Sequence, residues 1–133
     1  MIDLFVYGTL KKGYPNHTGY LDNSYFKGIF KTVAKFPLVI AGKRFTPVMM
    51  PEPGIGYHVI GELYSINEET LIKIDFLESI GKSYGYTRNN LEVINLENEF
   101  SIQCYSYFKG RDKLKLIHTE YLEKYTDARY LKK

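Results

Sequence analysis

The sequence predicts an α+β fold in which many short strands surround one main helix and form a small, closed or nearly closed barrel. Three observations support this prediction. The chain holds 13 Tyr and 8 Phe among 133 residues, and aromatic residues favour strands. Short β-prone segments recur along most of its length, separated by Gly and Pro. A single stretch near the middle carries strong helix signals. Strands around one helix indicate the α+β class.

Strands are expected wherever a short apolar, β-prone segment lies between turn signals. The first such segment ends at Gly8, and the prolines between residues 37 and 53 suit edges and turns better than a central parallel sheet. The segment after the loop PEPGIG alternates, which places Val59, Gly61 and Leu63 on one face. The expected strands are residues 2–7, 25–33, 36–40, 48–50, 57–66, 86–96 and 100–108.

The main helix is expected to begin at Asn67, because asparagine caps helix N-termini and two glutamates follow it at the positive end of the helix dipole. It should continue to about Ser79 and stop near Gly81. Its apolar residues surround the helix axis, which predicts packing on more than one side. These residues are Leu71, Ile72, Ile74, Phe76 and Leu77. A second, short helix is expected at residues 120–125.

Length and composition predict one domain over residues 1–133 in a cytoplasmic protein. Cys104 is the only cysteine, which excludes an intrachain disulfide and fits a reducing compartment. The first residues contain no basic leader, and no apolar segment is long enough to span a membrane. The net charge of +3 is small and the lysines are scattered, so we expect no nucleic-acid partner. We also expect a monomer.

Several familiar site patterns are missing from the sequence, including the nucleophile elbow and the phosphate-binding loop. GIGYHV, at residues 54–59, begins like a dinucleotide-binding motif. It lacks the third glycine of that motif and precedes a strand instead of a helix. The three histidines and Cys104 show no metal-ligand spacing. We therefore expect neither a metal ion nor a cofactor.

The end of the first expected strand is one candidate site, formed by Tyr7, Gly8, Thr9 and Leu10. A glycine at this point lets the backbone turn sharply and lets a ligand approach closely. Successive N–H groups in such a turn can form an anion-binding concavity. The same residues also fit an ordinary turn at the end of a strand.

Glu78, near the end of the expected helix, is the second candidate. Helical spacing places it beside Ile74 and Leu71 and close to Asp75. A carboxylate on such an apolar surface is partly desolvated, which raises its pKa. Enzymes prepare a glutamate for proton transfer near neutral pH in this way. A solvated glutamate at a helix end is the alternative interpretation.

Four segments within residues 2–108 match one family in the right order. They are VYGTLKKGYPNH (6–17), FPLVIAG (36–42), VIGELYSIN (59–67), and IDFLES with YTR (74–79 and 86–88). Together they resemble the γ-glutamyl cyclotransferase superfamily and, within it, the γ-glutamylamine cyclotransferase/AIG2-like branch. The resemblance implies a small mixed-strand β-barrel with one main helix packed against it.

The chain departs from the family pattern between IDFLES and YTR. The family often has a proline in this stretch, whereas this chain has IGKSYG (80–85) and one or two extra residues. Either Tyr84 or Tyr86 therefore fills the family's tyrosine position, and Tyr86 is assigned to substrate binding. The tail after about residue 108 matches the family least.

The resemblance implies a reaction on a small-molecule γ-glutamyl substrate. The free α-amine attacks the side-chain carbonyl of the same γ-glutamyl group, giving 5-oxoproline and a free amine. As implied by the resemblance, the amides of the Tyr7–Leu10 loop hold the α-carboxylate. Glu78 takes a proton from the attacking ammonium and returns one to the departing amine. No metal ion, cofactor or covalent enzyme intermediate is implied.

Three alternatives stay open. The same ring closure can act on γ-glutamyl amino acids or glutathione instead of a γ-glutamylamine such as γ-glutamyl-ε-lysine. A small-molecule binding module of the same fold is a second alternative, although a pure binder has no need of Glu78 beside the loop. An RNA or protein interaction domain would show a basic face, which the sequence does not indicate.

Overall fold

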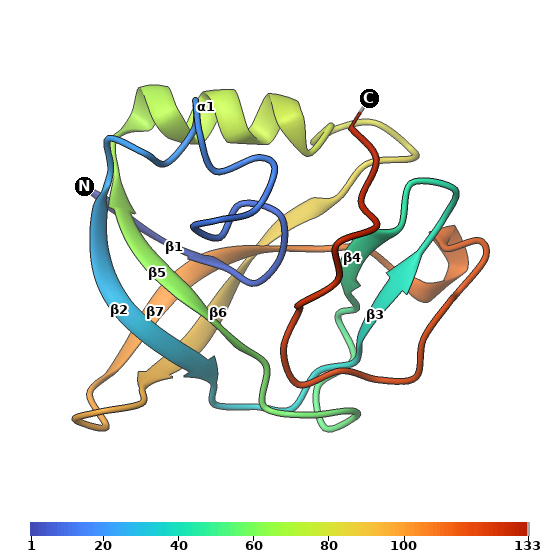
Figure 1. Cartoon of the computed structure of the whole chain (residues 1–133). Coiled ribbons are helices and arrows are strands. Elements are labelled where there is room, and N and C mark those ends of the chain that lie inside the picture. The colour runs from blue at the N-terminus through green and yellow to red at the C-terminus, as the bar shows by residue number, and fades with distance from the viewer. Residues whose placement is uncertain (133) are drawn as a thin grey trace.

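The computed structural model describes residues 1–132 and contains a closed barrel of strands in the order β1-β5-β2-β6-β7 (Figure 1). Neighbouring strands are antiparallel except β1 and β7, whose parallel pairing closes the barrel. The barrel strands are β1 (Ile2–Val6), β2 (Tyr25–Thr32), β5 (Ile60–Ile66), β6 (Thr87–Asn95) and β7 (Ser101–Phe108). The predicted α+β class, with mixed strands and one main helix, is confirmed.

A separate two-stranded hairpin of β3 (Leu38–Ala41) and β4 (Thr46–Met49) lies beside the barrel in Figure 1. A single 3-10 turn, η1 (Arg111–Lys113), follows β7. Every predicted strand is present, and the largest boundary shift is at β5, which begins at Ile60 instead of residue 57. Leu38 and Met49 belong to the same buried cluster as barrel residues, so the hairpin packs against the barrel.

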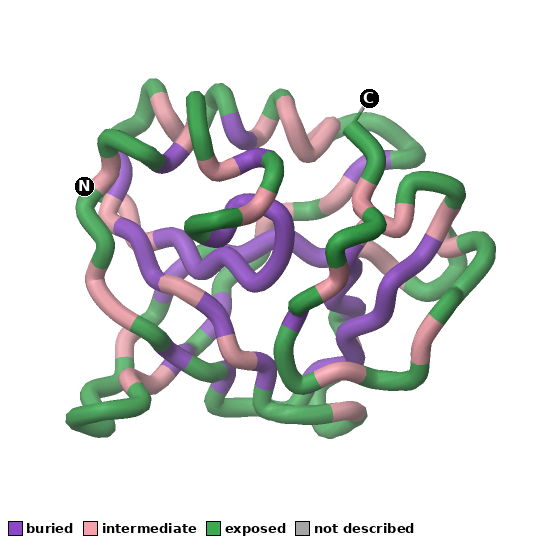
Figure 2. The backbone as a smooth tube through the Cα atoms, viewed as in Figure 1, coloured by how far each residue is buried: buried purple, intermediate pink, exposed green. Residues whose placement is uncertain are grey.

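Alternation along β1 and β5 divides the core into two layers. Phe5 pairs with Leu63, and both belong to the cluster that fills the barrel. In the adjacent pair of the ladder, Leu4 is opposite Tyr64, and both belong to a second cluster under the helix. Because side chains alternate between the faces of a strand, one strand pair contributes to both layers. Figure 2 shows the second half of β1 and the turn after it, residues 4–11, as one continuous buried segment.

The helix α1 (Glu68–Leu77) begins as predicted, because the Asn67 side chain accepts a hydrogen bond from the Thr70 N–H at 2.8 Å. It ends earlier than predicted, at Leu77, with Glu78 as the C-cap. Ser79 has a φ of 56°, so the chain leaves the helix there, before Gly81. None of the helices in residues 1–132 is long and apolar enough to cross a membrane.

The prediction that strands surround α1, and that it packs on more than one side, is wrong. Ile74 is fully buried, whereas Ile72 is 68% exposed and Phe76 is 88% exposed. The helix lies across the outer face of the barrel, so one of its faces contacts protein and the opposite face contacts solvent. The apolar residues around the axis did not identify the packed face, because burial depends on which side the barrel approaches.

The predicted short helix at residues 120–125 is also wrong, because this part of the tail is irregular, with bends, and its backbone pairs with strands. The Leu122 N–H donates to the Leu38 carbonyl at 2.8 Å, and the Ile60 N–H donates to the Glu123 carbonyl at 2.9 Å. Strand partners on both sides compete with helical hydrogen bonds, and here they replace them.

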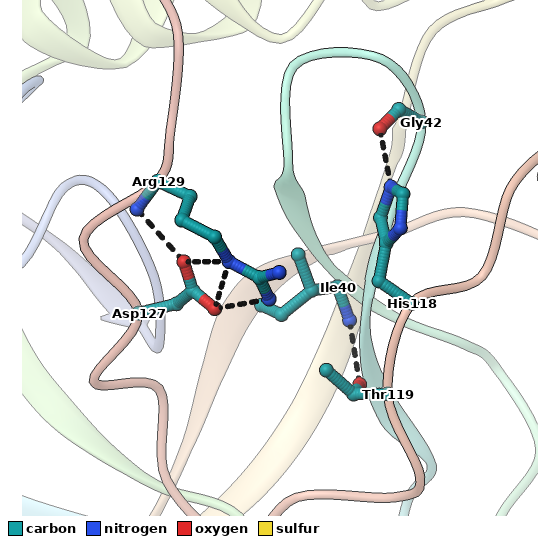
Figure 3. Close-up of polar contacts among 6 residues, drawn as sticks. All are labelled: Ile40, Gly42, His118, Thr119, Asp127 and Arg129. Atoms are coloured by element: carbon teal, nitrogen blue, oxygen red, sulfur yellow. Dashed lines mark hydrogen bonds and ion pairs between the residues drawn. The ribbon is translucent and has the colours of Figure 1, made fainter.

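Further polar contacts hold the tail against the hairpin (Figure 3). The Ile40 N–H donates to the Thr119 hydroxyl at 3.1 Å, and His118 Nε2 donates to the Gly42 carbonyl at 2.8 Å. Closer to the C-terminus, Asp127 accepts hydrogen bonds from the backbone and guanidinium of Arg129. The tail is thus an ordered strap across the hairpin.

Tyr125 anchors this strap in the barrel core. It is fully buried, and its hydroxyl has no hydrogen-bond partner within the described residues. Tyr125→Phe should therefore raise the free energy of unfolding by about 1 kcal/mol, because it removes a desolvated polar group and keeps the ring. Urea titrations measure the change. Tyr7→Phe is the matched control and should destabilise, since the Tyr7 hydroxyl donates to the Tyr107 carbonyl and accepts from the Met49 N–H. A loss of stability in Tyr125→Phe would contradict the prediction.

Candidate active site

A cavity of about 490 Å³ lies between the loop after β1, the end of α1 and β4. It joins the two candidate sites that are far apart in the sequence. The residues singled out from the sequence all line it: Tyr7, Gly8, Thr9, Leu10, Glu78 and Tyr86. The fold therefore brings the loop and the carboxylate to one place.

The loop that lines this cavity contains backbone donors that other parts of the described chain leave unused. The N–H groups of Gly8, Thr9 and Leu10 have no acceptor within residues 1–132. Asn16 holds the loop in shape, because its N–H donates to the Thr9 carbonyl and its Nδ2 to the Thr9 hydroxyl, both at 2.9 Å. Lys11 N–H closes the turn on the Gly8 carbonyl at 3.0 Å. Three consecutive open donors in a fixed turn can bind an anion such as a carboxylate.

Gly8 is required by packing as well as by the turn. Its φ is not positive, so its backbone conformation is open to other residues. A Cβ atom at Gly8 would stand 2.5 Å from Cγ of Pro47, which is closer than carbon atoms pack. The missing side chain therefore lets β4 close against the loop, a reason that the sequence interpretation did not include.

Tyr7 forms part of the cavity wall. Its hydroxyl donates to the Tyr107 carbonyl at 2.8 Å and accepts from the Met49 N–H at 3.2 Å. Burial raises the pKa of Tyr7 far above its usual value, opposed by the Met49 hydrogen bond and assisted by the negative charge of Glu78. With its hydroxyl committed to backbone partners, Tyr7 stays neutral and rigid, and joins β1 to β4 and β7.

Glu78 is fixed by its backbone at the C-cap of α1. Its N–H donates to the Ile74 carbonyl at 2.9 Å, and its own carbonyl accepts from the Tyr86 N–H at 3.0 Å. Its side chain is half-buried and lines the cavity. The carboxylate contributes to the raised pKa of both Tyr7 and Tyr86, which places its charge near them. The raised pKa expected for Glu78 itself stays a prediction.

Tyr84 and Tyr86 both line the cavity but differ in their surroundings. The Tyr86 hydroxyl donates to the Pro47 carbonyl at 2.8 Å, and Lys109 Nζ lies 4.4 Å from the centre of its ring. Burial raises the pKa of Tyr86 well above its usual value, with smaller effects from Tyr7 and Glu78. Tyr84 is 64% exposed at the rim. Tyr86 is thus the tyrosine that is built into the wall.

An ion pair supports the helix just before Glu78. Asp75 accepts a hydrogen bond from Arg88 at 2.7 Å on one oxygen and from the Tyr107 hydroxyl at 2.6 Å on the other. Arg88 is the last residue of the YTR motif, and Tyr107 lines the cavity. The contact joins the segments IDFLES and YTR in the fold, because it ties α1 to β6 and β7.

Sequence reasoning missed the part of the cavity wall that comes from the hairpin and the tail. In the hairpin and the tail these polar lining residues are Arg44, Thr46, Tyr130 and Lys132. Elsewhere the missed polar residues of the lining include Asn16, Tyr20, Tyr107 and Lys109. The motif VYGTLKKGYPNH includes Asn16, which was a usable signal. The others lie outside the matched motifs, and only the three-dimensional fold brings them to the loop.

Lys11 is a buried cation behind the loop. It is 3% exposed, and its Nζ donates to the Tyr125 carbonyl at 2.8 Å. Burial lowers the pKa of Lys11 from 10.5 to about 8, although the negative charge of Glu62 opposes this shift. The lysine therefore links the loop to the tail and carries a desolvated charge below that pH.

We expect this lysine to make stability depend on pH. Between pH 8 and 10.5 the unfolded chain holds the Lys11 proton and the folded chain has released it. The unfolded state then binds more protons, so the free energy of unfolding rises with pH. From pH 8 to about pH 9.5 the gain should approach 2 kcal/mol.

Urea titrations of wild type and Lys11→Met across this range test the sign and size. The difference in free energy of unfolding should move in favour of wild type as the pH rises, because only wild type has the Lys11 ammonium. Contributions from tyrosines and Cys104 are common to both proteins and cancel. Lys12→Met, at an exposed neighbouring position, should keep a constant difference from wild type. A constant difference for Lys11→Met would show that its ammonium is not desolvated.

The part of the chain that the structure describes holds no group of three or more His, Cys, Asp or Glu side chains able to bind a metal ion. The charged side chains that line the cavity are Arg44, Glu78, Lys109 and Lys132. The chemical resources of the cavity are therefore open backbone donors, one carboxylate, several cations and neutral tyrosines. Such a set can bind an anion and transfer protons.

Comparisons with known proteins identify the family to which the chain belongs. The profile of the family described as Gamma-glutamyl cyclotransferase, AIG2-like, matches residues 4–127. The gamma-glutamylaminecyclotransferase of Mus musculus is 37% identical over 94% of this chain and 89% of its own length. The protein of the same name from Rattus norvegicus is 40% identical over 80% of this chain and 77% of its own length.

Solved structures show the same relationship. A crystal structure of an AIG2-like protein from Mus musculus superimposes with a TM-score of 0.87 at 37% identity, covering 100% of this chain and 97% of that one. A structure named gamma-glutamyl cyclotransferase superimposes with a TM-score of 0.68 at 18% identity over 87% of this chain and 69% of that one, a likeness of fold alone. The resemblance seen in the motifs is confirmed, and this chain belongs to the AIG2-like gamma-glutamyl cyclotransferase family.

Proposed function

We propose that the protein is a γ-glutamylamine cyclotransferase that converts a γ-glutamylamine to 5-oxoproline and a free amine. One observation carries the proposal: Gly8, Thr9 and Leu10, whose N–H groups have no acceptor among the described residues, line the same cavity as Glu78. An anion-binding turn and a proton acceptor are the two resources that ring closure of a γ-glutamyl group needs. The names of the mouse and rat relatives agree with this assignment.

In the proposed reaction the loop binds the α-carboxylate of the substrate through backbone N–H groups. Tyr7 and Tyr86 form the rigid wall against which the glutamyl chain folds. Holding the α-amine against the γ-carbonyl carbon converts a slow encounter into an oriented one, which can lower the barrier by up to about 7–11 kcal/mol. No group on the protein becomes covalently bonded to the substrate.

Glu78 accounts for the protons. The α-ammonium loses one proton to Glu78, and the amine attacks the γ-carbonyl carbon to form a new C–N bond. A second proton leaves the same nitrogen as the original amide C–N bond breaks. Glu78 passes both protons, one at a time, to the departing nitrogen, which leaves as an ammonium ion. A positioned proton carrier of this kind typically contributes ~10²–10⁴-fold in rate.

The test is direct. Purified protein is incubated separately with γ-glutamyl-ε-lysine, γ-glutamylalanine and glutathione, and the release of 5-oxoproline is measured. Turnover of γ-glutamyl-ε-lysine above the other two supports the proposal. A preference for γ-glutamylalanine or glutathione would replace it with the same ring closure on another donor. Binding of 5-oxoproline without turnover of any donor would indicate a binding module.

We also propose that the protein acts as a monomer in the cytoplasm. Cys104 is a free thiol, and it is buried, with burial raising its pKa to about 12. A protonated, inaccessible thiol does not pair two chains through a disulfide. Light scattering at assay concentration and cell fractionation test the two statements.

A further inference from the structure

The cavity has a second half that the matched motifs do not explain. Arg44 and Thr46 reach it from the hairpin β3–β4, and Tyr130 and Lys132 reach it from the tail. These two segments are joined, since the Leu131 N–H donates to the Arg44 carbonyl at 2.9 Å. The hairpin and the tail therefore form one wall of the cavity.

This wall is also tied to the loop that faces it. Asn16 Nδ2, which holds Thr9, donates to the Tyr130 hydroxyl at 3.3 Å. The preceding residue, Arg129, has its guanidinium 4.6 Å from the centre of the Phe45 ring. The same guanidinium pairs with Asp127 at 2.6 Å (Figure 3). Contacts on both sides fix the position of Tyr130, so the wall is an ordered part of the site.

The charge of this half is positive. No carboxylate in residues 1–132 forms an ion pair with Arg44 or Lys132. Glu78 is the only acidic residue among the described residues that line the cavity. The glutamyl half of a substrate is neutral overall, with one ammonium for Glu78 and one carboxylate for the loop. The positive charges of Arg44 and Lys132 can then interact with the other half of the substrate, which is the departing amine.

Resting on the proposed function, we propose that Arg44, Tyr130 and Lys132 form a subsite for the departing amine and select amines that carry a carboxylate. Arg44 and Lys132 attract the anion, and Tyr130 supplies ring surface for the carbon chain between the two ends. An amine that ends in a second cation is repelled by the same pair. Specificity in this subsite comes from attraction of one charge and repulsion of the other.

Three γ-glutamyl amides whose amines have equal chain length separate selection by charge from selection by size. Their amines are 6-aminohexanoate, hexylamine and 1,6-diaminohexane, which end in an anion, a methyl group and a cation. We expect kcat/KM to fall in that order, with at least ~10-fold between the first and the last and most of the change in KM. The ratio should shrink when salt is raised, because the cations are solvent-exposed and are screened.

Variants that each remove one positive charge, compared with matched controls, show which residues select between the donors. Arg44→Gln and Lys132→Gln should each reduce the ratio between the acid and diamine donors by about 3-fold, and the double variant should come close to abolishing it. Lys43→Gln and Lys115→Gln remove the same charge from exposed neighbouring positions outside the cavity lining, and should leave the ratio unchanged. The Lys132 side chain is exposed, so its variant tests the proposal with little effect on the core.

Inhibition by 5-oxoproline distinguishes the two possible roles of the cations. This product has the α-carboxylate and lacks the departing amine, so its inhibition constant should be the same in Arg44→Gln and wild type. Equal kcat/KM for the three donors would overturn the subsite. So would a loss of 5-oxoproline affinity in Arg44→Gln that matches its loss of kcat/KM, because Arg44 would then hold the glutamyl carboxylate. If no donor at all releases 5-oxoproline, the proposed function fails first and the subsite with it.

Discussion

Glu78→Gln is expected to lower the turnover of a γ-glutamylamine by at least ~100-fold, because glutamine keeps the shape of the side chain but cannot accept the ammonium proton. The fold should be retained, since the hydrogen bonds to Ile74 and Tyr86 use the backbone of Glu78. Steady-state release of 5-oxoproline gives the rate, and circular dichroism with urea titration gives the stability.

Binding of 5-oxoproline shows whether Glu78→Gln has lost catalysis alone or has lost the binding site as well. The α-carboxylate is assigned to the N–H groups of Gly8, Thr9 and Leu10, so Glu78→Gln should still bind 5-oxoproline. Calorimetric titration with 5-oxoproline measures this affinity. Glu69→Gln is a matched control on the same helix, because Glu69 is exposed and lies outside the cavity lining. A near wild-type rate in Glu78→Gln would reduce Glu78 to a helix-end carboxylate and remove the proposed mechanism.

Local signals in the sequence predicted many of the residues that line the candidate site, because the positions of these residues depend on short-range structure. The end of β1 is a strand that stops at a glycine, and the position of Glu78 follows from the Asn67 cap and the length of one helix. Each signal lies within a few residues of the feature that it predicts. The prediction of the barrel depended, in addition, on the order of the strands along the chain and on the family resemblance.

Long-range packing accounts for what could not be predicted. The exposure of Phe76 and Ile72 depends on which face of α1 meets the barrel, and composition around the axis does not specify it. The tail was predicted as a helix because its pairing with Leu38 and Ile60 joins segments that are distant in the chain. Gly8 fits against Pro47 for the same kind of reason. Contacts between distant segments leave no periodic pattern in either segment.

Arg88→Met is expected to lower kcat/KM by about 10-fold and the free energy of unfolding by about 1–3 kcal/mol, because it leaves Asp75 without its cation in a partly buried position. The two side chains are 29% and 24% exposed, and their atoms lie 2.7 Å apart. Asp75 is one helical turn before Glu78, so its unbalanced charge also disfavours ionisation of the neighbouring carboxylate. The acidic limb of the kcat/KM profile should therefore move to higher pH.

Rescue by a second substitution tests whether charge is the cause. In Asp75→Asn/Arg88→Met both charges are absent, and the amide oxygen of the substituted side chain can still accept the Tyr107 hydroxyl, so activity and the acidic limb should return toward wild type. A double-mutant cycle on stability should give a coupling energy of roughly 1–2 kcal/mol. Arg111→Met removes the exposed ion pair with Glu52 and is the control that should leave stability close to that of wild type. If Arg88→Met shows the wild-type pH profile, or if Asp75→Asn fails to rescue it, the pair supports only the fold and has no part in setting the charge around Glu78.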